Sequence, residues 1–354
     1  MSNLSLRIKQ ARKAAKLSLR ALADLIGLSH AAIKKYEDAD VYPSSDVLFK
    51  LSKALNVRVD FFFRPSKVSL EGVKFRKRKK LRKKAEEQIK FNVIDQIERR
   101  LELEGLYPES PTPSFELPDG LPNQINNLAE LESVAELLRT HWKLGLLPIY
   151  ELIDALETCG VRVFIVDSTE KDFDGLSTTI NNEPIIVVSS RCSGDRQRFS
   201  LMHELAHYIL KERLSSSIDE ERACDRLAGA MLLPREILFQ SIGKTRNSIE
   251  LQELLLLKEQ FQISMSAICH RLKDLKIITP YYHRNIMIQF SKRGWHTKEP
   301  GTKISPEKTH IFKQLLFHAL GEDYIGEAKA AELLSCSLRE LKILRQIPNH
   351  ARTC

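Results

Sequence analysis

The pentad HELAH at residues 203–207 restricts the fold of this chain more than any other stretch of its sequence. Apolar residues from Phe199 to Ile209 recur at helical spacing and predict the buried face of a helix. On a helix, histidines four residues apart lie one above the other, so His203 and His207 can bind one metal ion. Glu204 then points beside that ion, toward a water molecule bound to it. The pattern therefore predicts a helix that holds part of a metal site.

A metal site of this kind needs a third ligand, and the next predicted helix offers one. Glu221 and Asp225 stand four residues apart in the segment that follows. Glu221 can complete a tetrahedral set with the two histidines and a water molecule, and Asp225 can accept the outer N–H of a ligand histidine. Asp219 and Glu220 compete for the same role. The alternative interpretation is an amphipathic helix with two surface histidines beside an acidic turn.

The first 63 residues contain a pattern typical of a helix-turn-helix. Ser18 can cap a helix with one apolar face, Gly27 follows at the end of that helix, and Ser29 can cap the next one. Ile33 and Tyr36 of the second helix face inward, which leaves its other face for the DNA major groove. The predicted DNA-contacting residues of this motif are Ser29, His30, Ala31, Lys34 and Lys35. The alternative is a small helical bundle used only for protein contacts or dimerisation.

The net charge of +9 is concentrated in one segment. Residues 74–84 read KFRKRKKLRKK, and their basic side chains equal the net charge of the whole chain. Such a segment is either a solvated linker or one face of a long helix, or an arm that binds nucleic acid by displacing counterions. We favour the arm because the segment follows the helix-turn-helix. Its predicted DNA-contacting residues are Lys77, Arg78, Lys79 and Lys80.

Composition excludes several classes of protein. With 43% hydrophobic and 29% charged residues, the chain is neither collagen-like nor mainly disordered. No window approaches the roughly 20 apolar residues of a membrane span, and the amino terminus is charged where a signal peptide is apolar. The six cysteines show no CxxC spacing, which fits reduced thiols. The sequence therefore predicts a cytoplasmic protein without a membrane partner, and it contains no glycine-rich phosphate loop and no Ser-His-Asp signature.

The predicted fold class is multidomain and mainly α, with an α+β centre. An all-α helix-turn-helix domain comes first, followed by a linker helix, the metal-site domain and a helical C-terminal region. The predicted boundaries are 1–66 for the helix-turn-helix domain, 67–122 for the basic linker helix and a Pro-rich loop, 123–278 for the metal-site domain, and 279–354 for a helical accessory region.

Two details of the centre carry further expectations. The strand-like run PIIVVSS at residues 184–190 stands just before the HELAH helix, so we expect it to be a sheet edge that pairs with an extended substrate. A helical pair after Ser248, with Ser264 as a cap, resembles a second helix-turn-helix but lacks its glycine turn. We expect this pair to complete the core of the metal-site domain.

Residues 6–63 resemble the Xre (phage repressor-like) helix-turn-helix family over the full length of that domain. The resemblance implies binding to double-stranded DNA through the second motif helix. The family often has Gln at the first position of the first motif helix, where it braces the phosphate and recognition contacts. This chain has Leu19 at that position.

HELAH, with ERACDRLAGAMLLP after it and FDGLS at 173–177 before it, resembles the ImmA/IrrE family of zinc-dependent endopeptidases from about Val134 to Lys273. The resemblance implies a zincin-like, gluzincin-type metallopeptidase domain. In that family the residues that match His203, His207 and Glu221 bind zinc, and the residue that matches Glu204 is the catalytic acid/base. Asp225 stands where the family commonly has Asn, and Cys224 replaces a frequent Ala.

Together these patterns predict a DNA-binding zinc endopeptidase. The resemblance implies cleavage of a regulatory protein, typically a repressor, to control transcription in a stress response or in mobile elements. The predicted partners are double-stranded DNA and a protein substrate, with a homodimer as a further assembly. The runner-up is a transcriptional regulator or antitoxin-like binding protein whose metal site is sensory, structural or inactive. A third is an interaction protein whose helix-turn-helix only dimerises. Arg198, Tyr208 and His270 are candidates for stabilising the oxyanion.

Overall fold

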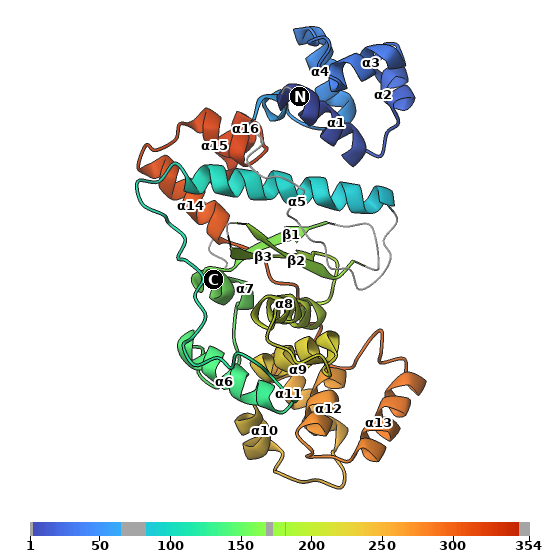
Figure 1. Cartoon of the computed structure of the whole chain (residues 1–354), viewed down its shortest axis with the longest axis vertical. Helices are drawn as coiled ribbons and strands as arrows, with labels where there is room; N and C mark the ends of the chain where they lie inside the picture. The colour runs from blue at the N-terminus through green and yellow to red at the C-terminus, as the bar shows by residue number, and fades with distance from the viewer. Residues whose placement is uncertain (1–2, 65–82, 168–172, 181, 347–354) are drawn as a thin grey trace, which may run out of the picture. The chain divides into compact units, whose positions relative to one another are not determined.

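The computed structural model describes residues 3–64, 83–167, 173–180 and 182–346, which form two compact units (Figure 1). We call the described residues up to 111 together with 310–346 the head unit, and those between 112 and 309 the sheet unit. The four-part division expected from the sequence remains a prediction. The two units separate residues 279–309, which group with the sheet, from the helices after 310, which group with the head.

The first part of the head unit is a bundle of short helices. They are α1 (Asn3–Ala14), α2 (Leu19–Ile26), α3 (His30–Glu37), α4 (Ser45–Leu55) and the 3-10 helix η1 (Val59–Phe63). The expected caps are present, because the Ser18 side chain accepts a hydrogen bond from the Ala21 N–H and Ser29 accepts one from Ala32. Gly27 adopts the left-handed conformation (φ 72°) that ends α2 and aims the chain into α3.

Four further helices complete the head unit. They are α5 (Lys83–Glu104), α14 (Ile311–Gly321), α15 (Glu327–Leu333) and α16 (Leu338–Arg345). α5 packs against α1, where Arg7 and Glu98 form a buried ion pair of 2.6 Å. Leu103, near the end of α5, shares a second apolar core with α14, α15 and α16. The helix predicted as a linker is therefore packed on both sides within its unit.

The sheet unit contains three strands: β1 (Arg162–Val166), β2 (Gly175–Ile180) and β3 (Glu183–Ser189). β3 lies in the middle, parallel to β1 and antiparallel to β2. The expectation that residues 184–190 form a sheet edge is therefore wrong. Every residue of β3 after Glu183 is buried, and such a continuous apolar run is typical of a strand with neighbours on both sides.

The other elements of this unit are helices. They are α6 (Glu130–His141), α7 (Leu152–Thr158), α8 (Gly194–Ile209), α9 (Glu220–Leu232), α10 (Arg235–Ser241), α11 (Leu251–Phe261), α12 (Met265–Asp274) and α13 (Pro280–Lys292). Of these helices, α7 contacts β1 and α8 contacts β2 and β3. α8 lies between the strands β2 and β3 and the helix α9 (Figure 1). α11 and α12 contribute to the main apolar core, which confirms that this pair completes the metal-site domain. Ser264 caps α12 as expected.

A buried carboxylate joins three of these helices. Glu132 of α6 accepts hydrogen bonds from Arg226 of α9 at 2.6 Å and from Arg271 of α12 at 2.6 and 2.9 Å. Burial by itself would raise the pKa of Glu132, but the hydrogen bonds and charges of Arg271 and Arg226 outweigh it and lower that pKa. The group therefore stays ionised, and its charge holds α6, α9 and α12 together.

An extended segment after α13 ties down the start of α8. The Gly194 N–H donates to the carbonyl of Ile304 at 2.9 Å, and the Glu307 carboxylate accepts from Arg198 and from the Ile153 N–H. The approach is so close that a Cβ on Gly194 would lie 2.3 Å from the Ser305 carbonyl oxygen. The segment thereby fixes the beginning of the helix that bears the HELAH pentad.

The observed architecture confirms the predicted fold class, a multidomain and mainly helical protein with a small mixed centre. Across the part of the chain that the structure describes, no helix is both long and apolar enough to cross a membrane.

Candidate metal centre

The two histidines of the pentad lie inside the sheet unit. Both belong to α8, and their exposed fractions are 1% for His203 and 5% for His207. The apolar face of α8 is buried against the sheet, and α9 covers the turn that bears the histidines. The alternative of two surface histidines is therefore wrong, because both are buried. Buried imidazoles need polar partners.

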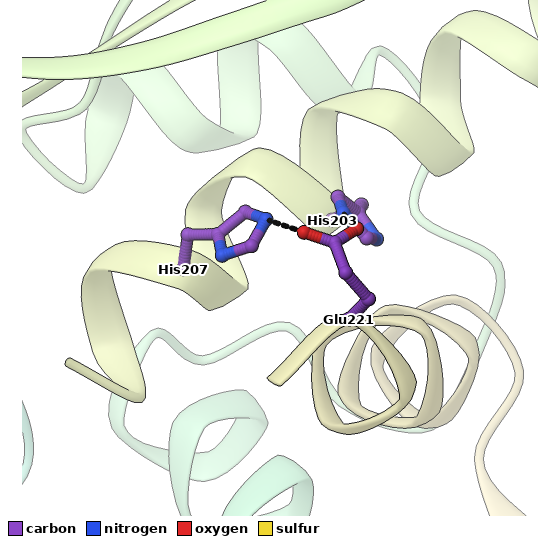
Figure 2. A group of neighbouring side chains, drawn as sticks. All are labelled: His203, His207 and Glu221. Carbon is purple, nitrogen blue, oxygen red and sulfur yellow. Dashed lines mark ion pairs between the residues drawn. The ribbon is translucent and has the colours of Figure 1, made fainter. Parts of the chain in front are cut away.

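Those partners come from the first turns of α9. Asp219 caps this helix by accepting a hydrogen bond from the Arg222 N–H at 2.9 Å, so it is occupied in starting the helix. Glu221 places its carboxylate between the two rings, 3.3 Å from Nε2 of His203 and 3.4 Å from Nε2 of His207 (Figure 2). One ligand atom from each of these three residues lies within 4.8 Å of the others.

The outer nitrogens of the two rings each meet a carboxylate. His203 Nδ1 lies 2.8 Å from Asp225, and His207 Nδ1 lies 3.0 Å from Glu220. An ionised carboxylate only accepts, so each pair favours a proton on Nδ1 and leaves the Nε2 lone pair available to a metal ion. Glu220, expected as a competitor of Glu221, thus takes a position by the second histidine like that of Asp225 by the first.

Cys224 of α9 adds a sulfur to this group. Its Sγ lies 3.3 Å from Nδ1 of His207, and the side chain is fully buried. The sequence presents Cys224 only as a replacement of a frequent Ala. The structure places it against a candidate ligand.

Glu204 lies between the histidines on α8 and faces the sheet. Glu204 is buried, with an exposed fraction of 7%. Its carboxylate accepts a hydrogen bond from the hydroxyl of Ser177 on β2 at 2.8 Å. Gly175 at the start of β2 allows the close approach of β3, since a Cβ there would lie 2.9 Å from the Val187 carbonyl oxygen. Sequence reasoning missed Ser177, although it lies in the FDGLS segment at 173–177.

Two of the three candidates for oxyanion stabilisation form hydrogen bonds elsewhere, and the third, His270, packs against the ring of His283. Arg198 donates to Glu307 and to the carbonyl of Ile149, and the Tyr208 hydroxyl donates to the carbonyl of Asn182 at 2.8 Å. Desolvation raises the pKa of Tyr208. Desolvation and the charge of Lys273 lower the pKa of His270, against the smaller effects of Asp274 and Asp225.

The predicted DNA-contacting residues of the head unit lie on one exposed helix. His30, Ala31, Lys34 and Lys35 are exposed on α3, and Ser29 is its N-cap. Lys77, Arg78, Lys79 and Lys80 lie outside the described residues.

The donor set of the sheet unit suits a metal ion. Two imidazole nitrogens and one carboxylate oxygen converge from two packed helices. The structure thus brings together the predicted ligands and the predicted outer carboxylate, and Glu204 lies next to His203 along α8. Their roles in catalysis remain predictions.

Comparison with protein families agrees with this architecture. Residues 156–273 match the family described as the IrrE N-terminal-like domain, peptidase family M78, and residues 8–62 match the family described as helix-turn-helix, HTH_3. No curated protein matches the chain. Both resemblances inferred from the sequence are thereby confirmed. The first match contains every residue of the metal-ligand group.

Proposed function

We propose that this chain, with its helix-turn-helix domain and its peptidase-family domain, is a DNA-binding zinc endopeptidase that cleaves a repressor-like regulatory protein. The observation that supports it most is the convergence of His203, His207 and Glu221 beside Glu204. A structural metal site needs no acid/base between its ligands, and a catalytic site does.

Zinc, when bound by these three residues, lowers the pKa of a bound water toward about 7 and polarises a scissile carbonyl. Glu204 accepts the proton of the attacking water and passes it to the leaving amine. Ser177 holds the Glu204 carboxylate in one orientation by its hydrogen bond. Asp225 and Glu220 hold the ligand rings, so that the nitrogens stay directed at the same point.

The substrate would approach along β2, which forms one edge of the described sheet. An extended peptide can add to such an edge through main-chain hydrogen bonds. Ser177 lies on this strand and touches Glu204, so a peptide paired with β2 would run past the acid/base. In this proposal β2 takes the substrate-pairing role that the sequence assigned to residues 184–190. Those residues belong to β3, whose backbone is already paired on both sides.

The head unit would bring the peptidase to a regulatory DNA site. The α3 face with Lys34 and Lys35 supports contact with the major groove. A peptidase held at the locus of its substrate would relieve repression directly, in a stress response or in a mobile element.

The experiment is digestion of a candidate repressor from the neighbouring locus by the zinc-loaded chain. We expect cleavage at a defined internal bond that stops when a chelator removes the metal and returns when zinc is added. An intact repressor in the presence of fully zinc-loaded protein would instead favour a regulator with a sensory or structural metal site.

A further inference from the structure

Two helix pairs of the head unit share one backbone arrangement. We call α2 and α3 the first motif, and α15 and α16 the second motif. In the first motif, the Leu28 N–H donates to the carbonyl of Ala23 at 3.0 Å, which closes the turn. In the second motif, the Cys336 N–H donates to the carbonyl of Ala331, also at 3.0 Å. The turns therefore close in the same way.

The residues that shape the two turns also correspond. Gly27 has a φ of 72° and Ser335 a φ of 53°, so both occupy the left-handed region. Ser29 caps α3 by accepting a hydrogen bond from the third residue after it, and Ser337 caps α16 in the same manner. The second motif thus has the cap and the turn of a helix-turn-helix without its glycine.

The packing of the second motif repeats that of the first. Ala23 and Ala331 are each 1% exposed at the place where the two helices cross, and a small residue there allows close approach. Ile33 of α3 and Leu341 of α16 are each fully buried. α14 and the end of α5 cover the second motif and supply the rest of its core, as Figure 1 shows beside α5.

We propose that α15 and α16 form a second helix-turn-helix that binds double-stranded DNA, with α16 in the major groove. Its match to the first motif places Leu338, Arg339, Lys342 and Ile343 where α3 has its predicted contact residues. All four side chains are exposed. The second motif lies outside both family matches.

The charges of α16 favour DNA as the occupant of this face. Within the described part of the chain, Arg339 and Lys342 form no ion pair, so both remain available to phosphate or to a guanine edge. The one acid of α16, Glu340, accepts hydrogen bonds from the Ser337 N–H and hydroxyl in a capping box. Leu338 and Ile343 are 48% and 57% exposed, and apolar side chains of this kind suit thymine methyl groups.

The two motifs are joined by hydrogen bonds within the head unit. Arg58, which follows α4, donates to the carbonyl of Cys336 in the second turn. Arg64 pairs with Asp95 of α5 at 2.9 Å and with Glu332 of α15 at 3.3 Å. The unit therefore presents two recognition helices on one scaffold, and each would read its own part of a longer site.

The test uses the full chain and duplexes selected from a random library for binding to it. We expect Arg339→Ala to weaken the selected duplex by about fivefold to a hundredfold and to relax selection at one or two base pairs. We expect Lys342→Ala to reduce the slope of log affinity against log salt by about 0.9. Lys313→Ala is the matched control, because Lys313 is an exposed lysine of α14 that the motif does not direct at DNA. It should change neither quantity.

A Lys34→Ala/Lys35→Ala variant separates the two motifs. We expect it to relax a different part of the selected site from the part that Arg339→Ala relaxes. The proposal is overturned if the wild type selects no duplex, or if the α16 variants leave affinity, slope and selected sequence unchanged. It is also overturned if these variants dissociate a dimer while DNA binding is unaltered. Unchanged melting temperatures show that the variants are folded.

Discussion

The outer nitrogen of each buried histidine lies against a separate carboxylate. Asp225 contacts His203 and Glu220 contacts His207, while Glu221 faces both inner nitrogens. This division follows from the helical spacing of α9. Glu221 and Asp225 are four residues apart and lie on one face of the helix, and Glu220 lies next to that face. Glu220, Glu221 and Asp225 thus contact different ring nitrogens because their side chains leave α9 in different directions.

Replacement of Asp225 by Asn tests the outer carboxylate. We expect Asp225→Asn to weaken zinc binding by about 10- to 100-fold, since the ring of His203 loses the charged acceptor that orients it. The measurement is a zinc titration against a chelating dye. Asp119→Asn, at an exposed loop position, is the control and should bind zinc as the wild type does. Equal affinities in the two variants would show that Asp225 does not support the ligand.

For single residues, the sequence predicts which side chains share one face of a helix. His203, Glu204 and His207 follow from one helical turn, and Glu221 with Asp225 from another. Ser177 and the contact of Glu220 with the second histidine depend on how β2 and α9 pack against α8. No local pattern reports such packing, so these partners appear only in the folded chain.

Elements whose ends have chemical signals were predicted accurately, and the others were not. Ser18, Gly27 and Ser29 each gave a cap or turn at the expected place. The turn of the second motif could not be predicted, because Ser335 adopts the left-handed conformation without being a glycine. The order of strands was also missed, since an apolar run indicates burial but not which strands lie beside it.

The buried charge group of Glu132 predicts how the sheet unit responds to pH. The pKa of Glu132 is lowered in the folded chain, so protonation favours unfolding. Its contribution to stability is full above the unfolded pKa, about 4.3, and is lost as the pH falls through the folded value. We expect the free energy of unfolding in urea to decline with acid over this range.

Glu132→Gln should remove that part of the decline and cost about 3 to 5 kcal/mol at neutral pH, because Arg271 loses its buried counter-charge and Arg226 keeps only its longer pair with Asp274 at 3.6 Å. Glu136→Gln is the matched control one turn further along α6. Its ion pair with Arg235 is about one third exposed, so the loss should stay below about 1 kcal/mol. Similar losses in both variants would contradict the role of the buried group.

At the scale of the whole molecule, charge and metal chemistry are separated along the chain. The basic run at 74–84 accounts for the net charge, and it stands between the helix-turn-helix domain and the peptidase-family domain. Neutralising Lys77, Arg78, Lys79 and Lys80 should lower the slope of log DNA affinity against log salt by up to about 3.6, at about 0.9 for each phosphate contact. An unchanged slope would remove this segment from the DNA interface.

The central claim, that Glu204 makes the metal group a peptidase, is tested by one comparison. Wild type and Glu204→Gln, each loaded with one zinc per chain, are incubated with a candidate repressor from the neighbouring locus, and new termini are identified by mass spectrometry. Glu204 lies beside the ligands and is not one of them, so both proteins should hold zinc equally. We predict one internal cut by the wild type and none by the variant. Cleavage by both proteins, or by neither, would contradict the account.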